Sequence, residues 1–151
     1  MPPASDDMTS PTQTVPGQLP ARQSLSRVAA RMLARARNEW EQRQFDAAEQ
    51  SLANVLALAP RDPDAIRMLG MVAQRRGDQV KAVDCFRQVL AVWPDDSDLR
   101  VWLGIVLYEH GETREAVTHL RDACRLEPAS VPAWFNLGEA LAREAYSEEA
   151  V

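Results

Sequence analysis

The sequence predicts an all-α fold, a right-handed solenoid of antiparallel helix pairs. Two observations lead to this prediction. Pro60, Pro94 and Pro128 each end a helical pattern and lie 34 residues apart (94 − 60 and 128 − 94), a period typical of helical repeat arrays. Between the prolines, apolar side chains recur at spacings of three and four residues, which places them on one face of a helix. We therefore expect one two-helix unit, repeated along the chain.

The composition is globular and offers nothing that would attract nucleic acid or a membrane. Of the 151 residues, 46% are hydrophobic and 26% are charged, and the formal net charge is −5. We therefore expect neither nucleic acid nor a membrane as a partner. No apolar run reaches the ~20 residues that span a bilayer, and no secretory signal is expected. Cys85 and Cys124 form no paired motif, which favours a reducing compartment, so we expect a cytoplasmic protein.

The chain divides into a leader and an array. Residues 1–21 are rich in Pro, Ser and Thr and lack apolar periodicity, so we expect a flexible Pro-rich leader there. The array is expected over residues 22–151, with an incomplete last unit, in the segments 22–60, 61–94, 95–128 and 129–151. Its helices are expected at residues 22–43, 45–59, 63–76, 79–92, 97–110, 113–126 and 131–144.

The ends of these helices carry capping and turn residues. Asp46 is expected to cap the second helix, because Asp at a helix start accepts from a free backbone N–H. Gly77 and Gly111 are expected to turn the chain within their units, since glycine adopts the left-handed conformation that often follows a helix. The fourth unit has Ala145 at the matching position. We expect the chain to turn there too, over residues 145–147, before a last short helix.

Small and large apolar residues recur in phase with the prolines. Twelve residues before each proline stands alanine, at Ala48, Ala82 and Ala116, and eight residues before it stand Leu52, Phe86 and Leu120. A Leu-Gly pair recurs at residues 69–70, 103–104 and 137–138, the last within the run WFNLG. Over about residues 29–151 these motifs resemble the tetratricopeptide repeat (TPR) family, in about three and a half repeats. Small residues let the two helices of a unit approach, and the large residue fills the space beside them.

The first and last units depart from this pattern. Arg35 and Ala36 replace Leu-Gly in the first unit, which suits an N-terminal cap with a long helix. The fourth unit has Ala145 in place of glycine and lacks nearly all of its second helix. Because a repeat cannot bury its apolar face alone, we expect the N-terminal part of a longer protein or a truncated gene product.

The resemblance implies a binding surface. In TPR arrays the first helix of each unit lines a concave face that contacts protein partners. The matching positions here form the predicted groove, namely Asp64, Arg67, Met71, Gln74, Asp98, Val101, Ile105, Tyr108, Phe135 and Glu139. Its apolar centre and charged edges suit an extended or helical peptide with hydrophobic anchors. A second interpretation stays open, in which Val101, Ile105 and Phe135 only pack against neighbouring helices.

Two specialised TPR sites do not match. The carboxylate clamp for chaperone C-terminal tails needs Lys and Asn on successive inner helices. Only Arg67 has suitable chemistry here, because the equivalent positions hold Leu33, Arg37, Met68 and Trp102. An asparagine ladder, as in O-GlcNAc transferases, would need Asn in every unit, and only Asn136 supplies one. We therefore expect neither site.

No catalytic or metal-binding pattern stands out. His110 and His119 are the only histidines and belong to no HExxH motif, so we expect both to be structural. Cys85 and Cys124 lie beside core positions, which favours packed thiols over redox chemistry. We expect no cofactor, no metal and no enzymatic activity in this chain.

The sequence thus favours a non-catalytic module that binds a protein or peptide in its groove. The alternative is the N-terminal TPR region of a longer bacterial multidomain enzyme, since the Ala/Arg-rich repeats are similar to those that precede sulfotransferase or aspartyl/asparaginyl hydroxylase domains. A further expectation concerns the incomplete last unit, which leaves Trp134, Leu137 and Leu141 partly covered. Uncovered apolar residues favour association, so we also expect self-association through the C-terminal end.

Overall fold

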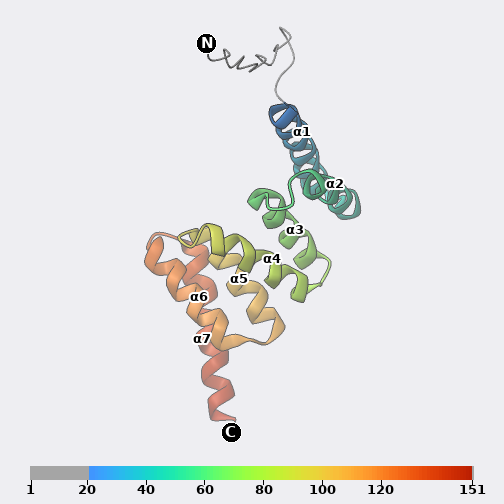
Figure 1. Cartoon of the computed structure of the whole chain (residues 1–151). Helices are drawn as coiled ribbons and strands as arrows, with labels where there is room; N and C mark the ends of the chain where they lie inside the picture. Colours follow the sequence, from blue (N-terminus) through green and yellow to red (C-terminus); the bar gives the residue numbers. More distant parts are fainter. Residues whose placement is uncertain (1–20, 151) are drawn as a thin grey trace, which may run out of the picture.

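The chain folds into a row of helices that stack one after another from α1 to α7 (Figure 1). The structure is a computed structural model that describes residues 21–150, with side chains from Ser26 onwards. Within this range it contains no strand, and its helices are α1 (Ala21–Glu41), α2 (Phe45–Leu58), α3 (Pro63–Arg75), α4 (Gln79–Val92), α5 (Ser97–His110), α6 (Thr113–Leu126) and α7 (Val131–Glu149). The all-α solenoid is confirmed. The predicted leader lies outside the described residues, except for Ala21, which begins α1.

The helices pack as three pairs and a single last helix. Helix α1 packs on α2, α3 on α4, and α5 on α6, while α7 packs on α6. Successive pairs meet through α2 with α3 and through α4 with α5. Helix α1 also contacts α3, and α5 contacts α7. Among the odd-numbered helices, α1 therefore approaches α3 and α5 approaches α7, as neighbouring inner helices of a curved array do.

Two apolar cores lie along the stack, and α3 contributes to both. The first core joins α1, α2 and α3 around the fully buried Leu52 and Val55. The second runs from α3 to α7 around the fully buried Phe86 and Leu120. Helix α3 places Val72 in the first core and Ala73 in the second. Each unit packs only on its neighbours, so the two cores follow one another along the stack and α3 lies between them.

Aspartate and serine residues cap several helices. Asp62, Asp78, Asp96 and Ser130 each accept a hydrogen bond from the backbone N–H three residues later, which satisfies a free donor of the first turn. The predicted cap at Asp46 is wrong. Helix α2 already begins at Phe45, its N-cap residue is Gln44, and Asp46 instead forms an ion pair with Arg76.

The turns inside the three pairs share one backbone conformation. Gly77 and Gly111 have φ angles of 81° and 94°, as predicted, and Arg43 at the equivalent position has a φ of 61°. The left-handed region is strained for a residue with a Cβ atom. Arg43 nevertheless adopts it, because the packing of α2 against α1 requires the chain to turn there.

The predicted turn at residues 145–147 is wrong. Helix α7 continues without a break to Glu149. Alanine and glutamate are good helix formers, and within the described residues no second helix follows that would favour the left-handed turn. Weak ion pairs of Arg114 with Glu144 and Glu148, at 3.8 and 3.9 Å, hold the end of α7 against α6.

Candidate functional site

The residues of the predicted groove all lie on odd-numbered helices. Its residues come from three helices, α3, α5 and α7, and α5 contacts α7 directly. Equivalent positions line up because the unit repeats every 34 residues, so Met71 on α3 corresponds to Ile105 on α5 and to Glu139 on α7. These three residues therefore occupy the same position in successive units.

The centre of the groove is apolar and only partly open. Met71, Ile105 and Tyr108 are half-buried and pack against the second core. Val101 is 7% exposed and belongs to that core, so it offers little surface to a partner. Phe135, the equivalent residue on α7, is 63% exposed. The same repeat position is thus a core residue in one unit and an open aromatic surface in the next.

At the other end of the groove, Arg67 is already neutralised. Its Nη2 atom donates to Asp96 Oδ2 at 2.6 Å, and its guanidinium lies 5.3 Å from the centroid of the Trp93 ring. Asp96 also caps α5 by accepting from the Leu99 backbone N–H at 2.9 Å. A ligand carboxylate would have to compete with Asp96 for Arg67.

The remaining polar groove residues differ in exposure. Asp64, Asp98 and Glu139 are exposed, whereas Gln74 is half-buried. The Oε1 atom of Gln74 is buried and accepts no hydrogen bond from any described residue. The Nε atom of Arg67 is also buried without a hydrogen-bond partner among the described residues. A buried polar atom without a partner is destabilising, so Arg67 and Gln74 are the two groove residues whose polar groups are incompletely satisfied.

A hollow of about 390 Å³ lies at the C-terminal end of the groove, between α5 and α7. It contains the predicted residues Tyr108 and Glu139 together with Ala142, Arg143 and Tyr146. Arg143 lies over the Tyr108 ring at 4.7 Å and its Nη1 atom donates to the Tyr108 carbonyl oxygen at 2.9 Å. Tyr146 was not predicted, because the sequence placed it in a turn. A continuous helix brings it beside Ala142, four residues earlier.

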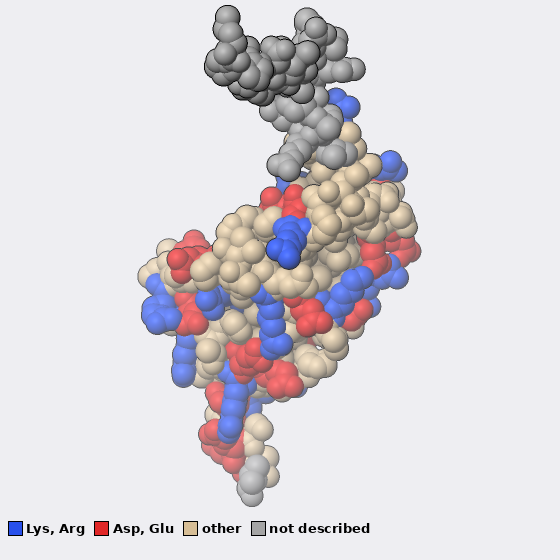
Figure 2. Space-filling model, viewed as in Figure 1, with Lys and Arg blue, Asp and Glu red and all other residues tan. Residues whose placement is uncertain are grey.

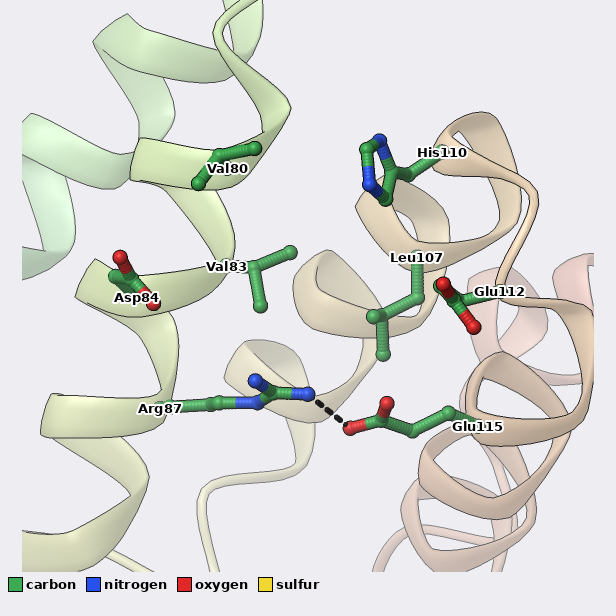
Figure 3. A pocket seen from close by; sticks show the side chains of 8 residues that line it. All are labelled: Val80, Val83, Asp84, Arg87, Leu107, His110, Glu112 and Glu115. Atoms are coloured by element: carbon green, nitrogen blue, oxygen red, sulfur yellow. Dashed lines mark hydrogen bonds and ion pairs between the residues drawn. The ribbon is translucent and has the colours of Figure 1, made fainter.

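A second hollow, of about 300 Å³, opens between α4 and α6 across the end of α5 (Figure 3). Val83 and Leu107 form its floor, and Arg87 Nη2 donates to Glu115 Oε1 at 2.6 Å across it. None of the ten residues of the predicted groove lines it. Within the described part of the chain, no group of His, Cys, Asp and Glu residues could hold a metal ion.

His119 and the two cysteines are packed within the stack, whereas His110 is exposed at the end of α5 and lines the hollow between α4 and α6. His119 Nδ1 lies 3.3 Å from Arg100 Nη1, which also contacts Asp122, and burial, ahead of the Arg100 charge, lowers the pKa of His119. Cys85 and Cys124 are buried free thiols, and burial raises the pKa of both. A protonated, buried thiol is a poor nucleophile, so these residues pack rather than react.

Charge on the surface is mixed. Figure 2 shows basic and acidic side chains interspersed over the visible face, in keeping with the modest net charge of −5. Ion pairs such as Lys81 with Glu49, at 2.6 Å, bridge neighbouring units. No helix among residues 21–150 is long and apolar enough to cross a membrane.

Comparison with known proteins identifies the architecture. A family model described as tetratricopeptide repeat matches residues 33–97, 67–130 and 103–150. The chain is similar to the first TPR of Spaghetti (RPAP3) bound to an HSP90 peptide, with a TM-score of 0.74 at 15% identity; the match covers 78% of this chain and 93% of that one. The Sgt2 TPR domain from Aspergillus fumigatus gives 0.74 at 14% identity, covering 80% and 82% of the two chains.

In a third solved structure, the matching region is a small part of a much longer chain. The match to an O-GlcNAc transferase from Thermobaculum terrenum has a TM-score of 0.73 at 24% identity, and covers 82% of this chain but only 23% of the transferase. A search of curated proteins finds no match. Structural matches at identities of 14 to 24% show only that the fold is shared. The family model, in contrast, matches the sequence itself over most of its length. The chain belongs to the tetratricopeptide repeat family.

Proposed function

We propose that this chain is a non-catalytic module that binds a segment of a partner protein in the predicted groove. The observation that carries the proposal is the row of accessible apolar side chains on α5 and α7, where Ile105 and Tyr108 are half-buried and Phe135 is 63% exposed. Exposed aromatic residues beside an apolar floor are typical anchor points for a peptide. The peptide bound by the similar Spaghetti TPR supports this use of the fold.

The groove favours an internal segment of the partner over a free C-terminus. Arg67 is paired with Asp96, so a terminal carboxylate would have to displace that ion pair to bind Arg67. The hollow beside Tyr108 accepts an aliphatic or aromatic side chain, and Arg143 can stack on its edge. The free, buried thiols support a reducing, cytoplasmic setting.

Peptide selection tests this proposal, because random peptides sample many possible partner segments at once. A display library of such peptides is selected against the full chain, and the selected peptides are measured by fluorescence anisotropy. Tyr108→Ala with Phe135→Ala should weaken binding by about tenfold or more, the usual loss for truncated aromatic anchors. The matched control, Val80→Ala with Val92→Ala, changes two exposed apolar residues on α4 and should leave binding unchanged. Equal binding by both double variants would place the binding surface elsewhere.

A second candidate function rests on the transferase match, in which the similar array is a small part of an enzyme chain. We propose as the alternative that this array recruits a substrate for a catalytic domain of a longer bacterial protein, such as a sulfotransferase or an aspartyl/asparaginyl hydroxylase. Sequencing the gene past the codon for Val151 decides between the two. An in-frame catalytic domain supports the alternative, and a stop codon removes it.

A further inference from the structure

One pair of repeat positions carries an ion pair at the first and at the third junction between units. At the first junction, between α2 and the end of α3, Arg76 pairs with Asp46 and, at 2.7 Å, with Glu49. At the third junction, between α6 and α7, Arg114 lies 3.8 Å from Glu144. Asp46 and Arg114 are two repeats apart, and so are Arg76 and Glu144 (114 − 46 and 144 − 76). At both junctions these positions therefore hold opposite charges.

At the second junction this ion pair is missing. Val80 on α4 and His110 at the end of α5 occupy the two positions, one repeat after Asp46 and Arg76. Val80 is 62% exposed, and His110, also exposed, forms no ion pair with a described residue. The hollow of about 300 Å³ lies between these two side chains (Figure 3). The second junction thus offers an open space where the other two carry a charge pair.

The hollow combines an apolar wall with a polar mouth. Val83 and Leu107 form its floor, and Val80 exposes an apolar wall beside them. Asp84 on α4 and Glu112 just before α6 stand on opposite sides of the hollow. The Glu112 backbone N–H donates to the Leu107 carbonyl oxygen at 2.8 Å, which fixes Glu112 beside the floor. These five residues define what we call the junction hollow.

The junction hollow is negatively charged. Arg87 donates to Glu115 at 2.6 Å across it, so these two charges offset each other. Asp84 and Glu112 are exposed, and neither pairs with a described residue. With His110 neutral, three carboxylates and one guanidinium give the lining a net charge of −2 (−3 + 1). This charge opposes an anion and attracts a ligand that joins an apolar part to a positive end.

We propose that the junction hollow binds a lysine or arginine side chain of a partner protein. The aliphatic stem of such a side chain lies along Val80, as these stems do on apolar surface, and its charged end reaches Glu112, with Asp84 adding attraction. The partner then supplies at the second junction the positive charge that Arg76 supplies at the first. None of the ten residues of the predicted groove lines the hollow, so this proposal does not rest on binding in the groove.

Titration with single amino-acid amides tests the hollow directly. N-acetyl-arginine amide and N-acetyl-lysine amide are each added to the ¹⁵N-labelled full chain, and the backbone amide chemical shifts are followed by NMR. Saturable shifts are expected at Val80, Leu107 and Glu112, with a dissociation constant of roughly a few millimolar. N-acetyl-norleucine amide keeps an aliphatic stem without the charge, and it should bind about threefold more weakly or worse. Absence of saturable shifts with both cations, or equal binding of the norleucine amide, overturns the proposal.

Removal of the free carboxylates tests the charge. Asp84→Asn with Glu112→Gln keeps the shape of the hollow, and the affinity for both cationic amides should fall about threefold or more. The matched control is Asp95→Asn with Glu127→Gln, which removes two exposed carboxylates from the loops that follow α4 and α6. The control should bind like the original chain, and circular dichroism should show an intact fold for both variants. Equal weakening in both would show general attraction to an acidic protein and overturns the site.

A second variant closes the hollow from within. Val80→Asp with His110→Arg copies the pair that Asp46 and Arg76 form at the first junction, and with His110 neutral it leaves the net charge unchanged. The new pair should occupy the hollow, so binding of the cationic amides should fall to the level of the norleucine amide, with an unchanged or higher melting temperature. Undiminished binding by this variant overturns the proposal.

The two double variants of the peptide experiment separate this site from the groove. Tyr108→Ala with Phe135→Ala alters only the groove and should leave binding of the cationic amides unchanged. Val80→Ala with Val92→Ala shortens the apolar wall and should weaken these amides about twofold, although it leaves groove peptides bound. Loss of the cationic amides in the groove variant overturns the assignment to the hollow. Failure of the groove peptides alone would refute the groove and leave this site in place.

Discussion

Helices α3 and α7 carry the same Leu-Gly pair, yet the glycine has a different task in each. Gly70 leaves room for Phe86, whose ring would lie 2.6 Å from a Cβ atom at that position. Gly138 faces no other helix in the described chain. The motif therefore specifies a surface that can be packed closely. Whether it is packed depends on the helix that follows.

The turn between the two helices of a unit also depends on the helix that follows it. Arg43, Gly77 and Gly111 all have positive φ angles, although only two of them are glycine. Ala145 stands at the equivalent position of the last unit and remains in α7. Glycine makes the turn inexpensive, but Arg43 shows that a packed second helix is enough to impose it.

The largest expected effect is the loss of the residue that covers Gly70. Phe86 is fully buried in the second core, so Phe86→Ala should lower the free energy of unfolding by about 3–5 kcal/mol through lost apolar contacts and a cavity. Urea unfolding followed by circular dichroism measures this change. Val92→Ala on the same helix is the control, since Val92 is 58% exposed and its loss should cost about 0.5 kcal/mol or less. Similar costs for the two variants would contradict the packing described for α4.

The next effect separates the two glycines directly. Gly70→Ala should lower the free energy of unfolding by about 1–2 kcal/mol, because overpacking against Phe86 and Cys85 outweighs the better helix propensity of alanine. Gly138→Ala should raise it by about 0.5–1 kcal/mol, since the propensity gain is unopposed. Both changes are measured by urea unfolding at a protein concentration where the chain is monomeric. Effects of the same sign would remove the distinction between a covered and an uncovered unit.

The first pair, α1 with α2, is closed partly by a polar contact, which makes it sensitive to pH. Glu39 is buried and accepts from Ser51 Oγ at 2.6 Å and from the exposed Arg35 at 2.8 Å. The hydrogen bond from Ser51, opposed by burial and aided by Arg35, holds the pKa of Glu39 below its ordinary value. Because the folded-state pKa is the lower one, this stabilisation is present above the unfolded-state pKa. It is lost as the pH falls through the folded-state pKa.

Ser51→Ala should therefore lower the free energy of unfolding by about 1–2 kcal/mol at neutral pH, since it leaves a buried carboxylate with one partner fewer. The loss should shrink as the pH falls through the folded-state pKa of Glu39, because the carboxyl group is then protonated in both states. Urea unfolding at a series of pH values measures this, with Ser51→Ala in a Glu39→Gln background as the control. A loss independent of pH would show that Ser51 acts through packing alone.

The smallest effect concerns the turn. Arg43→Gly should raise the free energy of unfolding by about 0.5–1 kcal/mol, because glycine adopts the observed φ of 61° without strain. Ala145→Gly makes the equivalent substitution in the last unit and should lower it by up to about 1 kcal/mol, since glycine weakens a helix interior. Thermal unfolding of both variants beside the original chain measures the pair. A gain at both positions would mean that residue 145 also prefers to turn.

Much of the fold could be read from the residues, and the failures have local causes. Helix α4 was predicted at residues 79–92, and α5 and α6 were predicted at 97–110 and 113–126, as found. In these units the prolines, the glycines and the spacing of the apolar residues all indicate the same helix boundaries. Asp46 failed as a cap because α2 begins at Phe45, as predicted, which makes Gln44 the N-cap residue and places Asp46 inside the first turn. Its carboxylate pairs with Arg76 of the next unit instead, and a local pattern does not contain such a contact.

The candidate site shows the same limit. The repeat period places all ten residues of the predicted groove on α3, α5 and α7. It does not predict their exposure, because Val101 is buried in the core whereas the equivalent Phe135 is 63% exposed. The pairing of Arg67 with Asp96 joins residues 29 positions apart, and no motif announces it. Tyr146 enters the groove only because α7 continues past residue 145.

The sequence by itself determined the repeat, its helices and the face that each unit offers to its neighbour, because these follow from residue spacing and from the local chemistry of proline, glycine and apolar side chains. Only the tertiary structure decided which of these faces is covered and which stays open. Leu-Gly at residues 69–70 and at 137–138 is the same local signal, and within residues 21–150 Gly70 is packed while Gly138 is not. Packing is a contact between helices distant in sequence, so its energy depends on the neighbour that is present and not on the motif alone.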